Sequence, residues 1–288
     1  RIEELCERVT SGGTPLRSNP DYYTGGTIDW FKTGELNDGY LGAAEEKITQ
    51  LAVDKTSVKV FPRDTVLMAM YGDGRTITTL GMLRSPATTN QACAAMIVRE
   101  SICIPKYFFY ALKSRRHLFL GLALGGAQRN LSAKVVKDFR LPVPPIAAQR
   151  AIVEILAAYD DLIENCERRI RILDEMARKL YREWFVHFRY PGHENVPLVD
   201  SALGKIPKDW TVKPIEQLLE LHIGGGWGND APDSESEPAW VIRGTDLPQL
   251  STGRLEKIPH RHHKRSNLKP RLLQAKDIVF ECSGGSKG

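Results

Sequence analysis

The stretch that decides the architecture is IVEILAAYDDLIENCERRIRILDEMARKLYREW, residues 152–184. An alternation of steps of four and three averages 3.5 residues, the a/d repeat of a coiled coil, whereas an ordinary surface helix follows a period of 3.6. The pattern predicts one long helix that pairs with another helix and separates the units on either side of it. The residues that follow this alternation are Ile152, Leu156, Tyr159, Ile163, Cys166, Ile170, Leu173, Ala177, Leu180 and Trp184.

Proline and glycine bracket this predicted helix. The segment 142–145, Pro-Val-Pro-Pro, is an extended junction, because proline is tolerated only in the first turn of a helix. The pair at 191–192, Pro-Gly, ends the helix near Tyr190. At 1.5 Å per residue such a helix spans about 65 Å. The predicted organisation is a first unit over 1–144, the helix over 145–190 and a second unit over 191–288.

The two flanking units carry the same succession of short motifs. Each has an Ile-Glu-x-Leu start, a Gly-Gly pair, a run that begins with Trp, a Glu-Lys-Ile triplet and an Asp-x-Val run. Motifs in one order at a nearly constant shift of about 210 positions indicate a duplicated domain. The copies lie at 2–5, 12–13, 30–36, 46–48 and 64–67, and at 215–218, 224–225, 240–247, 256–258 and 277–280.

The second copy reaches Gly288 without a counterpart of residues 76–189, so we expect a truncated second domain in a fragment of a longer protein. Short β-branched and apolar runs at 28–32, 65–70 and 94–98 predict strands, and residues 107–120 predict a helix with aromatic packing. Gly-rich and Ser/Thr-rich turn clusters separate these elements. The predicted class of the globular units is therefore α+β with long loops.

Composition excludes several classes of protein. A chain of 288 residues with 42% hydrophobic and 26% charged residues is long enough for two cores. It contains no apolar run of the roughly 20 residues that a membrane span needs and no signal-peptide pattern at its start, so the cytoplasm is the expected location. The five cysteines show no Cys-x-x-Cys spacing, which argues against a disulfide framework and a thiolate zinc site.

The formal net charge of +5 is unevenly distributed. Acids and bases nearly balance along the predicted helix, whereas basic residues exceed acids in the globular units, above all over 254–276. A basic surface on a compact domain is typical of phosphate binding. A solvated basic face explains the same charge equally well.

Several motifs together resemble those of one known family. They are Ser-Gly-Gly-Thr-Pro at 11–15, Ile-Asp-Trp-Phe-Lys at 28–32, Asn-Leu-Ser at 130–132, Leu-Pro-Val-Pro-Pro-Ile-Ala-Ala-Gln-Arg-Ala-Ile-Val at 141–153 and Leu-Gly-Lys-Ile-Pro-Lys-Asp-Trp at 203–210. The chain resembles the DNA-specificity (S) subunits of type I restriction-modification enzymes along essentially its whole length. The Pro-Pro-Ile-x-x-Gln junction before a heptad helix is the most specific part of the match.

The resemblance implies a protein that recognises double-stranded DNA and has no catalytic or metal-binding residues. Residues 1–144 and 191–288 would be target-recognition domains, each reading half of a split site, with paired helices as the ruler between them. Methyltransferase (M) and restriction/motor (R) subunits would dock on this scaffold and carry S-adenosylmethionine, ATP and Mg²⁺. A heptad seam without its partner helix also predicts self-association.

Base recognition requires polar side chains on loops that reach a groove, with Arg paired to guanine and Asn or Gln to adenine. Candidates lie in or beside Gly-rich and Ser/Thr-rich loops. In the first unit they are Thr14, Arg17, Lys32, Thr33, Arg75, Asn90, Gln91, Gln128 and Arg129, and in the second Arg243, Arg261, Lys264 and Arg265. Asn90 and Gln91 would equally well satisfy buried backbone groups.

Other motifs suggest chemistry that the rest of the sequence does not support. Asn-Pro-Asp-Tyr at 19–22 resembles an amino-methyltransferase motif, but no Gly-rich cofactor loop accompanies it. Asp21, Glu45 and Lys47 match a loose metal-nuclease pattern that recurs by chance. The histidines at 260–263 are interleaved with cations, and 283–288 lacks the spacing of a phosphate loop. The remaining alternatives are the recognition half of a fused restriction enzyme and a coiled-coil adaptor without a DNA role.

Overall fold

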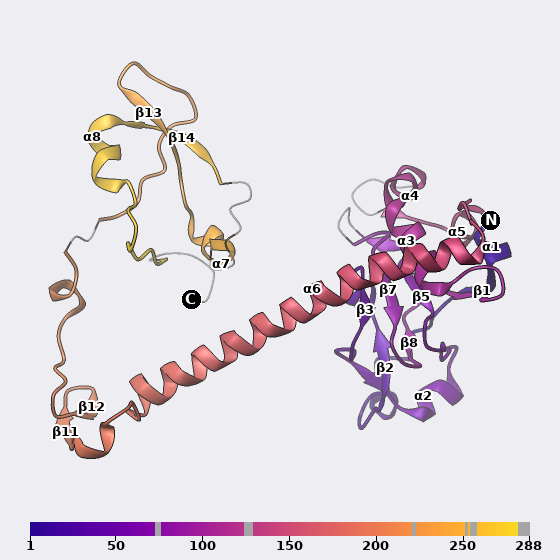
Figure 1. The fold of residues 1–288 in the computed structure, drawn as a ribbon, viewed down its shortest axis with the longest axis horizontal. Helices are drawn as coiled ribbons and strands as arrows, with labels where there is room; N and C mark the ends of the chain where they lie inside the picture. The colour runs from indigo at the N-terminus through magenta and orange to yellow at the C-terminus, as the bar shows by residue number, and fades with distance from the viewer. Residues whose placement is uncertain (73–75, 124–128, 221–222, 251–252, 254–257, 282–288) are drawn as a thin grey trace. The chain divides into compact units, whose positions relative to one another are not determined.

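The computed structural model describes the chain apart from residues 73–75, 124–128, 221–222, 251–252, 254–257 and 282–288. The chain divides into two compact units, unit 1 over Arg1–Met176 and unit 2 over Ala177–Gly288. Unit 1 is a mixed α/β body from which the long helix α6 (Ile146–Tyr181) starts (Figure 1). No helix in the described ranges is both long and apolar enough to cross a membrane.

Unit 1 is built on a five-stranded sheet in the order β1-β9-β5-β7-β3. β3 runs parallel to β7, and the other neighbours are antiparallel. A second sheet has the order β4-β2-β8, and β10 pairs with β6. The strands are β1 (Cys6–Ser11), β2 (Ile28–Phe31), β3 (Tyr40–Leu41), β4 (Lys47–Ile48), β5 (Val66–Ala69), β6 (Tyr71–Gly72), β7 (Leu80–Leu83), β8 (Thr88–Thr89), β9 (Cys93–Val98) and β10 (Arg129–Asn130).

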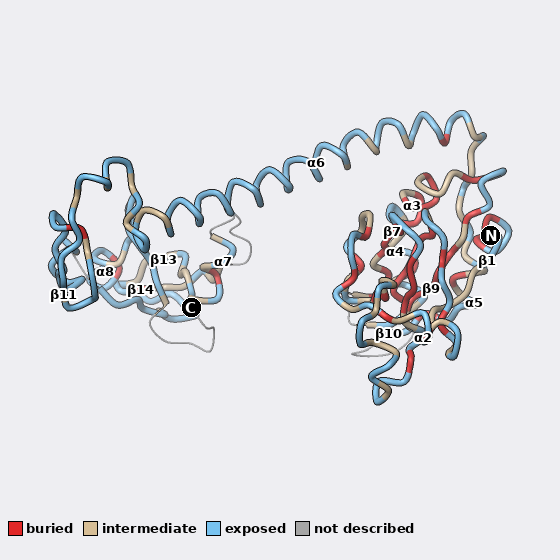
Figure 2. Tube along the Cα trace, turned by 90° about the horizontal axis from the view of Figure 1, so that it is seen from below, coloured by how far each residue is buried: buried red, intermediate tan, exposed pale blue. Residues whose placement is uncertain are grey.

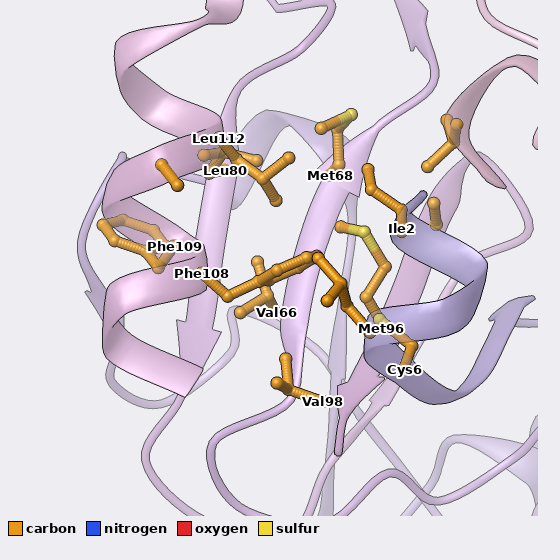
Figure 3. Close-up of a cluster of buried hydrophobic side chains, with 14 of the residues drawn as sticks. Ile2, Cys6, Val66, Met68, Leu80, Met96, Val98, Phe108, Phe109 and Leu112 are labelled. Carbon is orange, nitrogen blue, oxygen red and sulfur yellow. The ribbon is translucent and has the colours of Figure 1, made fainter. Parts of the chain in front are cut away.

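The central strand β5 is buried on both faces, and its side chains alternate between two clusters with the period of two that a strand imposes. Val66 and Met68 join the larger cluster, which Figure 3 shows against the sheet with a helix on each side. Leu67 and Ala69 join the smaller cluster on the other face, around Phe61. The apolar run predicted as a strand at 65–70 is therefore the core of unit 1.

Helices cover the larger cluster. α3 begins with Pro105 at its first position, where a missing N–H costs nothing, and buries Phe108 and Leu112 completely or nearly so. The single helix expected over 107–120 is two, because the backbone leaves the helical region at Arg115. The helices of this unit are α1 (Ile2–Leu5), α2 (Gln50–Lys55), α3 (Pro105–Ser114), α4 (Arg116–Leu122) and α5 (Ala133–Asp138), with short 3-10 turns η1 (Pro20–Tyr22) and η2 (Thr33–Glu35).

The start of α6 is fixed to unit 1 by Gln149, the glutamine of the Pro-Pro-Ile-x-x-Gln junction. Its side chain is fully buried. Its Nε2 donates to the carbonyls of Ile102 at 3.1 Å and Pro144 at 2.8 Å, and its Oε1 accepts the N–H of Ile104 at 2.8 Å. The junction motif therefore has a structural role, since one amide joins the helix to the segment between β9 and α3.

Two further contacts continue along the same side of α6. The Tyr110 hydroxyl donates to Asp160 at 2.5 Å, and Arg84 donates to Glu164 at 2.6 Å. We call Gln149, Asp160 and Glu164 the clamp face. At 100° per residue this face lies about 90° around the helix from the heptad seam. The contacts of unit 1 therefore leave the seam uncovered.

The heptad seam is exposed along α6 (Figure 2). Ile163 is 56% exposed, Ile170 65% and Leu173 60%. Apolar side chains at this spacing are the knobs of a coiled coil rather than a face packed on their own domain. The seam thus has the chemistry of an unfilled helix–helix interface.

α6 ends earlier than the expected Tyr190. A π-helical turn follows over Arg182–Val186, where the N–H of His187 bonds to the carbonyl of Arg182 at 2.9 Å. Phe188 then takes a left-handed φ of 54°, which turns the chain before Pro191. The stop is therefore made by hydrogen bonding and backbone conformation, and proline lies beyond it.

Unit 2 contains a hairpin, β11 (Leu198–Ser201) with β12 (Gly204–Pro207), and a ribbon, β13 (Ser236–Trp240) with β14 (His260–Lys264). Trp210 packs on Phe185, Phe188 and Tyr190, at centroid distances of 5.3–6.0 Å. The helical segments of unit 2 are η4 (His193–Asn195), η5 (Ile215–Gln217), η6 (Gly244–Asp246), α7 (Leu247–Leu250), α8 (Arg265–Leu268) and η7 (Lys269–Arg271).

The repeated motif after the Trp run has the same local structure in both units. In unit 1 the N–H of Lys32 donates to the carboxylate of Glu35 at 2.9 Å at the start of η2. In unit 2 the N–H of Arg243 donates to Asp246 at 2.9 Å at the start of η6. An acid that caps a 3-10 turn three residues after a basic residue is thus common to the two units.

Candidate DNA interface

The Gly-Gly turn of unit 1 brings two candidate residues together. The N–H of Gly13 donates to the carbonyl of Thr89 at 2.9 Å. A Cβ on Gly12 would lie 1.9 Å from that carbonyl oxygen, so only glycine allows this approach. The turn and the loop after β8 therefore lie side by side, and the Thr14 hydroxyl bonds to the side-chain oxygen of Gln91. Both side chains are exposed, as a group that reads a base must be.

Asn90 lies in the same loop with its main chain fully used. Its N–H donates to the carbonyl of Phe31 at 3.0 Å, and its own carbonyl accepts the N–H of Cys93 at 3.3 Å. The side-chain Oδ1 is buried and has no hydrogen-bond partner among the described residues. The main chain, rather than the amide, thus joins β2 to the start of β9. Thr33 lies beside this loop, half-buried at the first position of η2.

Arg17 and Lys32 converge on one carboxylate. The Arg17 guanidinium bonds to both oxygens of Glu46, and the Lys32 ammonium bonds to Glu46 at 2.8 Å and Glu45 at 3.2 Å. We call these four residues the Glu46 cluster. Its formal charges sum to zero, so the two cations are already paired within the domain.

The pairing shifts the acid–base equilibria of the cluster. Hydrogen bonds from Arg17 and then Lys32 lower the pKa of Glu46 to about 2. The bond to Glu46 raises the pKa of Arg17, and bonds to Glu46 and Glu45 raise the pKa of Lys32. All three groups therefore stay charged across the physiological range.

The main chain of one further candidate, Arg129, is joined to the Gln91 loop through hydrogen bonds. The N–H of Met70 donates to the carbonyl of Ala92 at 2.9 Å, and the N–H of Leu131 donates to the carbonyl of Met70 at 2.8 Å. This ladder joins the Gln91 loop to β6 and β10, and Arg129 in β10 pairs with Gly72. The candidates Arg75 and Gln128 lie outside the described residues.

Three of the four candidates in unit 2 are bonded to acids. Arg243 forms two bonds to Asp246 at 2.8–2.9 Å, and Arg265 bonds to Glu237 at 2.7 Å. Arg261 bonds to Asp230 and stacks on Trp227, with 12% of its side chain exposed. Lys264 is exposed at the end of β14.

Motifs that suggested catalytic chemistry take structural roles. The Asn19 side chain accepts the N–H of Asp21 at 3.1 Å and so caps η1. Lys47 pairs with Asp29 at 3.2 Å. The histidines at 260–263 belong to β14, and among the described residues no three His, Cys, Asp or Glu side chains form a group that could hold a metal ion. The phosphate-loop-like segment at 283–288 lies outside the described residues.

Two residues that contact the candidate interface were missed from the sequence. Glu46 was noted only as part of a repeated triplet, although it lies at the centre of the charged cluster. Lys59 was not singled out, yet its ammonium bonds to Thr10 at 2.8 Å and to the carbonyl of Ser11 at 3.3 Å beside the Gly-Gly turn. Neither has a local signal, because the partners of Glu46 lie 14 and 29 residues away in the chain and those of Lys59 lie 48 and 49 residues away.

A family model described as "Type I restriction modification DNA specificity domain" matches residues 1–173. The chain belongs to this family. The resemblance stated from its motifs is therefore confirmed, and the matched range contains every candidate residue of unit 1. The family domain also includes the clamp face and most of the heptad seam.

Curated relatives agree with the family. The chain is 28% identical over 240 residues to the Type I restriction enzyme MjaIX specificity subunit of Methanocaldococcus jannaschii, covering 82% of this chain and 53% of the relative. It is 28% identical over 189 residues to the Type I restriction enzyme EcoR124I/EcoR124II specificity subunit of Escherichia coli, covering 64% and 46%. The chain thus spans about half the length of these two relatives.

A solved structure shares the fold. The S subunit of a type I restriction-modification system from M. genitalium superposes with a TM-score of 0.50 at 17% identity, over 81% of this chain and 59% of that one. The mixed α/β class and the long helix are confirmed by the structure and this likeness.

Proposed function

We propose that this chain is the DNA-recognition part of a type I restriction-modification specificity subunit, that it acts in the cytoplasm and that it catalyses no reaction itself. The observation that carries the proposal is the convergence of polar side chains from distant segments at one edge of the family domain. Thr14 and Gln91 meet there, 77 residues apart in the chain, with Lys32, Thr33 and Arg129 on adjoining segments. The exposed Thr14 and Gln91 side chains, on loops held by main-chain hydrogen bonds, match the donors and acceptors of base edges in the major groove.

Rigidity supports this role because a reader must hold its donors and acceptors in fixed positions before it meets DNA. The Gly13–Thr89 hydrogen bond and the Trp30 Nε1–H bond to the carbonyl of Gly13, at 2.9 Å each, anchor the turn to the buried core. Binding then costs little ordering of loops. Basic groups beside the loops supply phosphate contacts that position the duplex.

We also propose that residues 191–288 belong to a second recognition domain. The repeated motifs and the matching capped turns at Lys32 and Arg243 support a common origin for the two units. Each domain would read one half of a split site, and the helix would set the gap. In this arrangement the exposed seam of α6 pairs antiparallel with a second helix, in the complete subunit or in a second copy of this chain.

Partner subunits supply the chemistry in this proposal. Methyltransferase subunits would bring S-adenosylmethionine, and restriction/motor subunits would bring ATP and Mg²⁺. The two relatives named above are themselves specificity subunits, which favours a separate recognition subunit over a fused restriction enzyme.

Duplex binding as a function of salt tests the proposal. A protein that contacts three phosphates should lose about fortyfold in affinity between 50 and 200 mM salt, because log K falls by about 0.9 per phosphate for each decade of salt. Gln91→Ala should relax the preference for one base position in a selection from random duplexes, at a cost of about 1–3 kcal/mol. Gln50→Ala, on exposed α2, is the control. Salt-independent binding, or no binding at 50 mM salt, would contradict the proposal.

A further inference from the structure

The Glu46 cluster holds two cations of the candidate DNA interface in a neutralised state. Its main chain is anchored: the carbonyl of Glu46 accepts the N–H of Trp30 at 3.1 Å. Glu35 accepts the N–H groups of Lys32 at 2.9 Å and Glu45 at 2.8 Å through its two carboxylate oxygens. The acids are thus positioned against the cations by the fold, and are not mobile side chains that meet them by chance.

Arg17 is held in place independently of Glu46. Its guanidinium carbon lies 4.8 Å from the centroid of the Tyr23 ring and 4.7 Å from that of Trp30. Trp30 is buried and Tyr23 is tied through its hydroxyl to the carbonyl of Pro15 at 2.7 Å, so both rings are fixed. Cation–π contacts of this kind orient the guanidinium without using its N–H donors. A different anion could therefore take the place of Glu46 without moving Arg17.

A DNA phosphate has the chemistry of such an anion. Arg and Lys are the residues that bind phosphate oxygens, and Arg does so with two parallel N–H donors, as it does here with a carboxylate. The Arg17 side chain is 52% exposed and that of Glu46 33%, so the pair is open to an incoming ligand. A phosphate and Glu46 would then compete for one site.

We propose that Glu46 is a specificity-determining residue whose carboxylate occupies the anion position of Arg17 and Lys32, so that unit 1 gains little from phosphate contacts with non-cognate duplex. Only a duplex that also makes base contacts with the neighbouring loop displaces Glu46. The inference rests on the proposed DNA-recognition function. Discrimination of this kind needs a repulsive element against the wrong partner as well as attraction to the right one.

Glu46→Gln tests the inference, because it removes the negative charge and keeps the shape of the side chain. Binding of the 288-residue chain to random-sequence duplex should tighten about tenfold at 50 mM salt. The slope of log K against log salt should steepen by about one, the value for one added phosphate contact. Adding Arg17→Met to this variant should remove most of the gain.

Glu100→Gln is the matched control. It makes the same change in net charge on an exposed acid that follows the C-terminal end of β9, whereas Asn90 and Gln91 precede the N-terminal end of that strand. Screening over about 10 Å at 0.1 M salt should keep its effect below twofold, with an unchanged slope. Thermal unfolding of each variant shows whether it remains folded.

If Glu46→Gln unfolds, Arg17→Met in the wild-type background replaces it. A neutralised Arg17 predicts random-duplex affinity within twofold of wild type, and a large loss would overturn the inference.

An affinity and slope for Glu46→Gln equal to those of Glu100→Gln would also overturn it, while salt-dependent binding by the wild type leaves the proposed function standing. Weaker binding of Glu46→Gln to every duplex would instead make Glu46 a direct contact, such as an acceptor for cytosine N4. If neither the wild-type chain nor Glu46→Gln binds duplex DNA, the proposed function and the inference both fail.

Discussion

Gln149 shows how one buried side chain can fix two elements. All three of its hydrogen bonds go to main-chain groups that no regular strand or helix satisfies, two of them on the segment that leads into α3. Buried amides of this kind are stabilising only while every partner is present, because each orphaned group costs about 1–3 kcal/mol. The residue therefore couples the recognition domain to the start of its helix.

Replacing Gln149 with Ala should lower the free energy of unfolding of unit 1 by about 2–4 kcal/mol, since it leaves the Ile104 N–H and two carbonyls without partners. Hydrogen exchange over β9 and α3 in urea measures this loss locally. Gln50→Ala, which removes an exposed bond to Asp54, is the control and should cost under about 0.5 kcal/mol. If Gln149→Ala also lowered the free energy of unfolding by less than about 0.5 kcal/mol, the hydrogen bonds of Gln149 would not be what holds α6 to the segment before α3.

The lowered pKa of Glu46 predicts how the stability of the folded chain depends on pH. Its pKa falls from the ordinary 4.5 to about 2 in the folded chain. A depressed carboxyl pKa gives stability that is present above the unfolded value and is lost as pH falls through the folded value. The difference in melting temperature between wild type and Glu46→Gln should be constant from pH 8 to 5 and shrink between about 4.5 and 2.

The contribution is small, about 1 kcal/mol, because the ion pairs are partly exposed. A difference in melting temperature that grew on acidification would contradict the assignment of these hydrogen bonds. Glu100→Gln, which makes the same change in net charge on an exposed acid, is measured beside it.

At the scale of elements, the sequence predicted three strands of unit 1 and the long helix. Runs at 28–32, 65–70 and 94–98 became β2, β5 and β9, because β-branched and apolar side chains fit a strand that is buried on one or both faces. The heptad pattern placed α6 correctly through Tyr181. What it could not give was the end of the helix, which depends on a π-turn and a left-handed Phe188 rather than on a proline.

The candidate interface was predicted only as a set of residue types. Thr14 and Gln91 were selected separately from their loops, and the structure brings them together across 77 residues. Arg17 and Lys32 were likewise selected from their loops, but their pairing with Glu46 arises from a contact between β2 and the segment before β4 that has no local pattern. Long-range contacts of this kind are the part that residue periodicity does not encode.

The exposed seam of α6 predicts self-association. Burial of an a/d seam contributes roughly 25 cal/mol per Å² of apolar surface, which amounts to several kcal/mol over four heptads. Sedimentation of the chain should give an antiparallel dimer at tens of micromolar, and Ile163→Asp with Ile170→Asp should give a monomer. The exposed Cys166 lies in the seam, so its labelling by a thiol reagent should slow as the concentration of the chain rises.

Glu164→Gln with Asp160→Asn is the matched control, because it alters the clamp face and leaves the seam intact. This variant should remain dimeric. A wild-type chain that is monomeric at tens of micromolar, with labelling of Cys166 independent of concentration, would mean that the seam does not pair in this chain.

At the scale of the whole molecule, the proposed plan is a recognition domain followed by a helix, with a second recognition domain after it. The family domain covers residues 1–173, and the motifs of unit 1 return in unit 2 after α6. The last residue of the clamp face along α6 is Glu164, so a change after Cys166 leaves the three clamp-face residues in place. The proposed function thus gives base recognition and spacing to separate parts of the chain.

The most direct test of this account is a genome-wide methylation map from cells that carry the complete system, with residues 1–140 exchanged for the equivalent segment of a relative. If unit 1 reads its own half-site, the exchange changes one half of the methylated sequence and leaves the other half and the gap intact. Four residues inserted after Cys166 shift the seam by about 6 Å, near two base pairs, and should lengthen the gap alone. An exchange that alters both halves, or only the gap, would contradict the assignment of base recognition to unit 1.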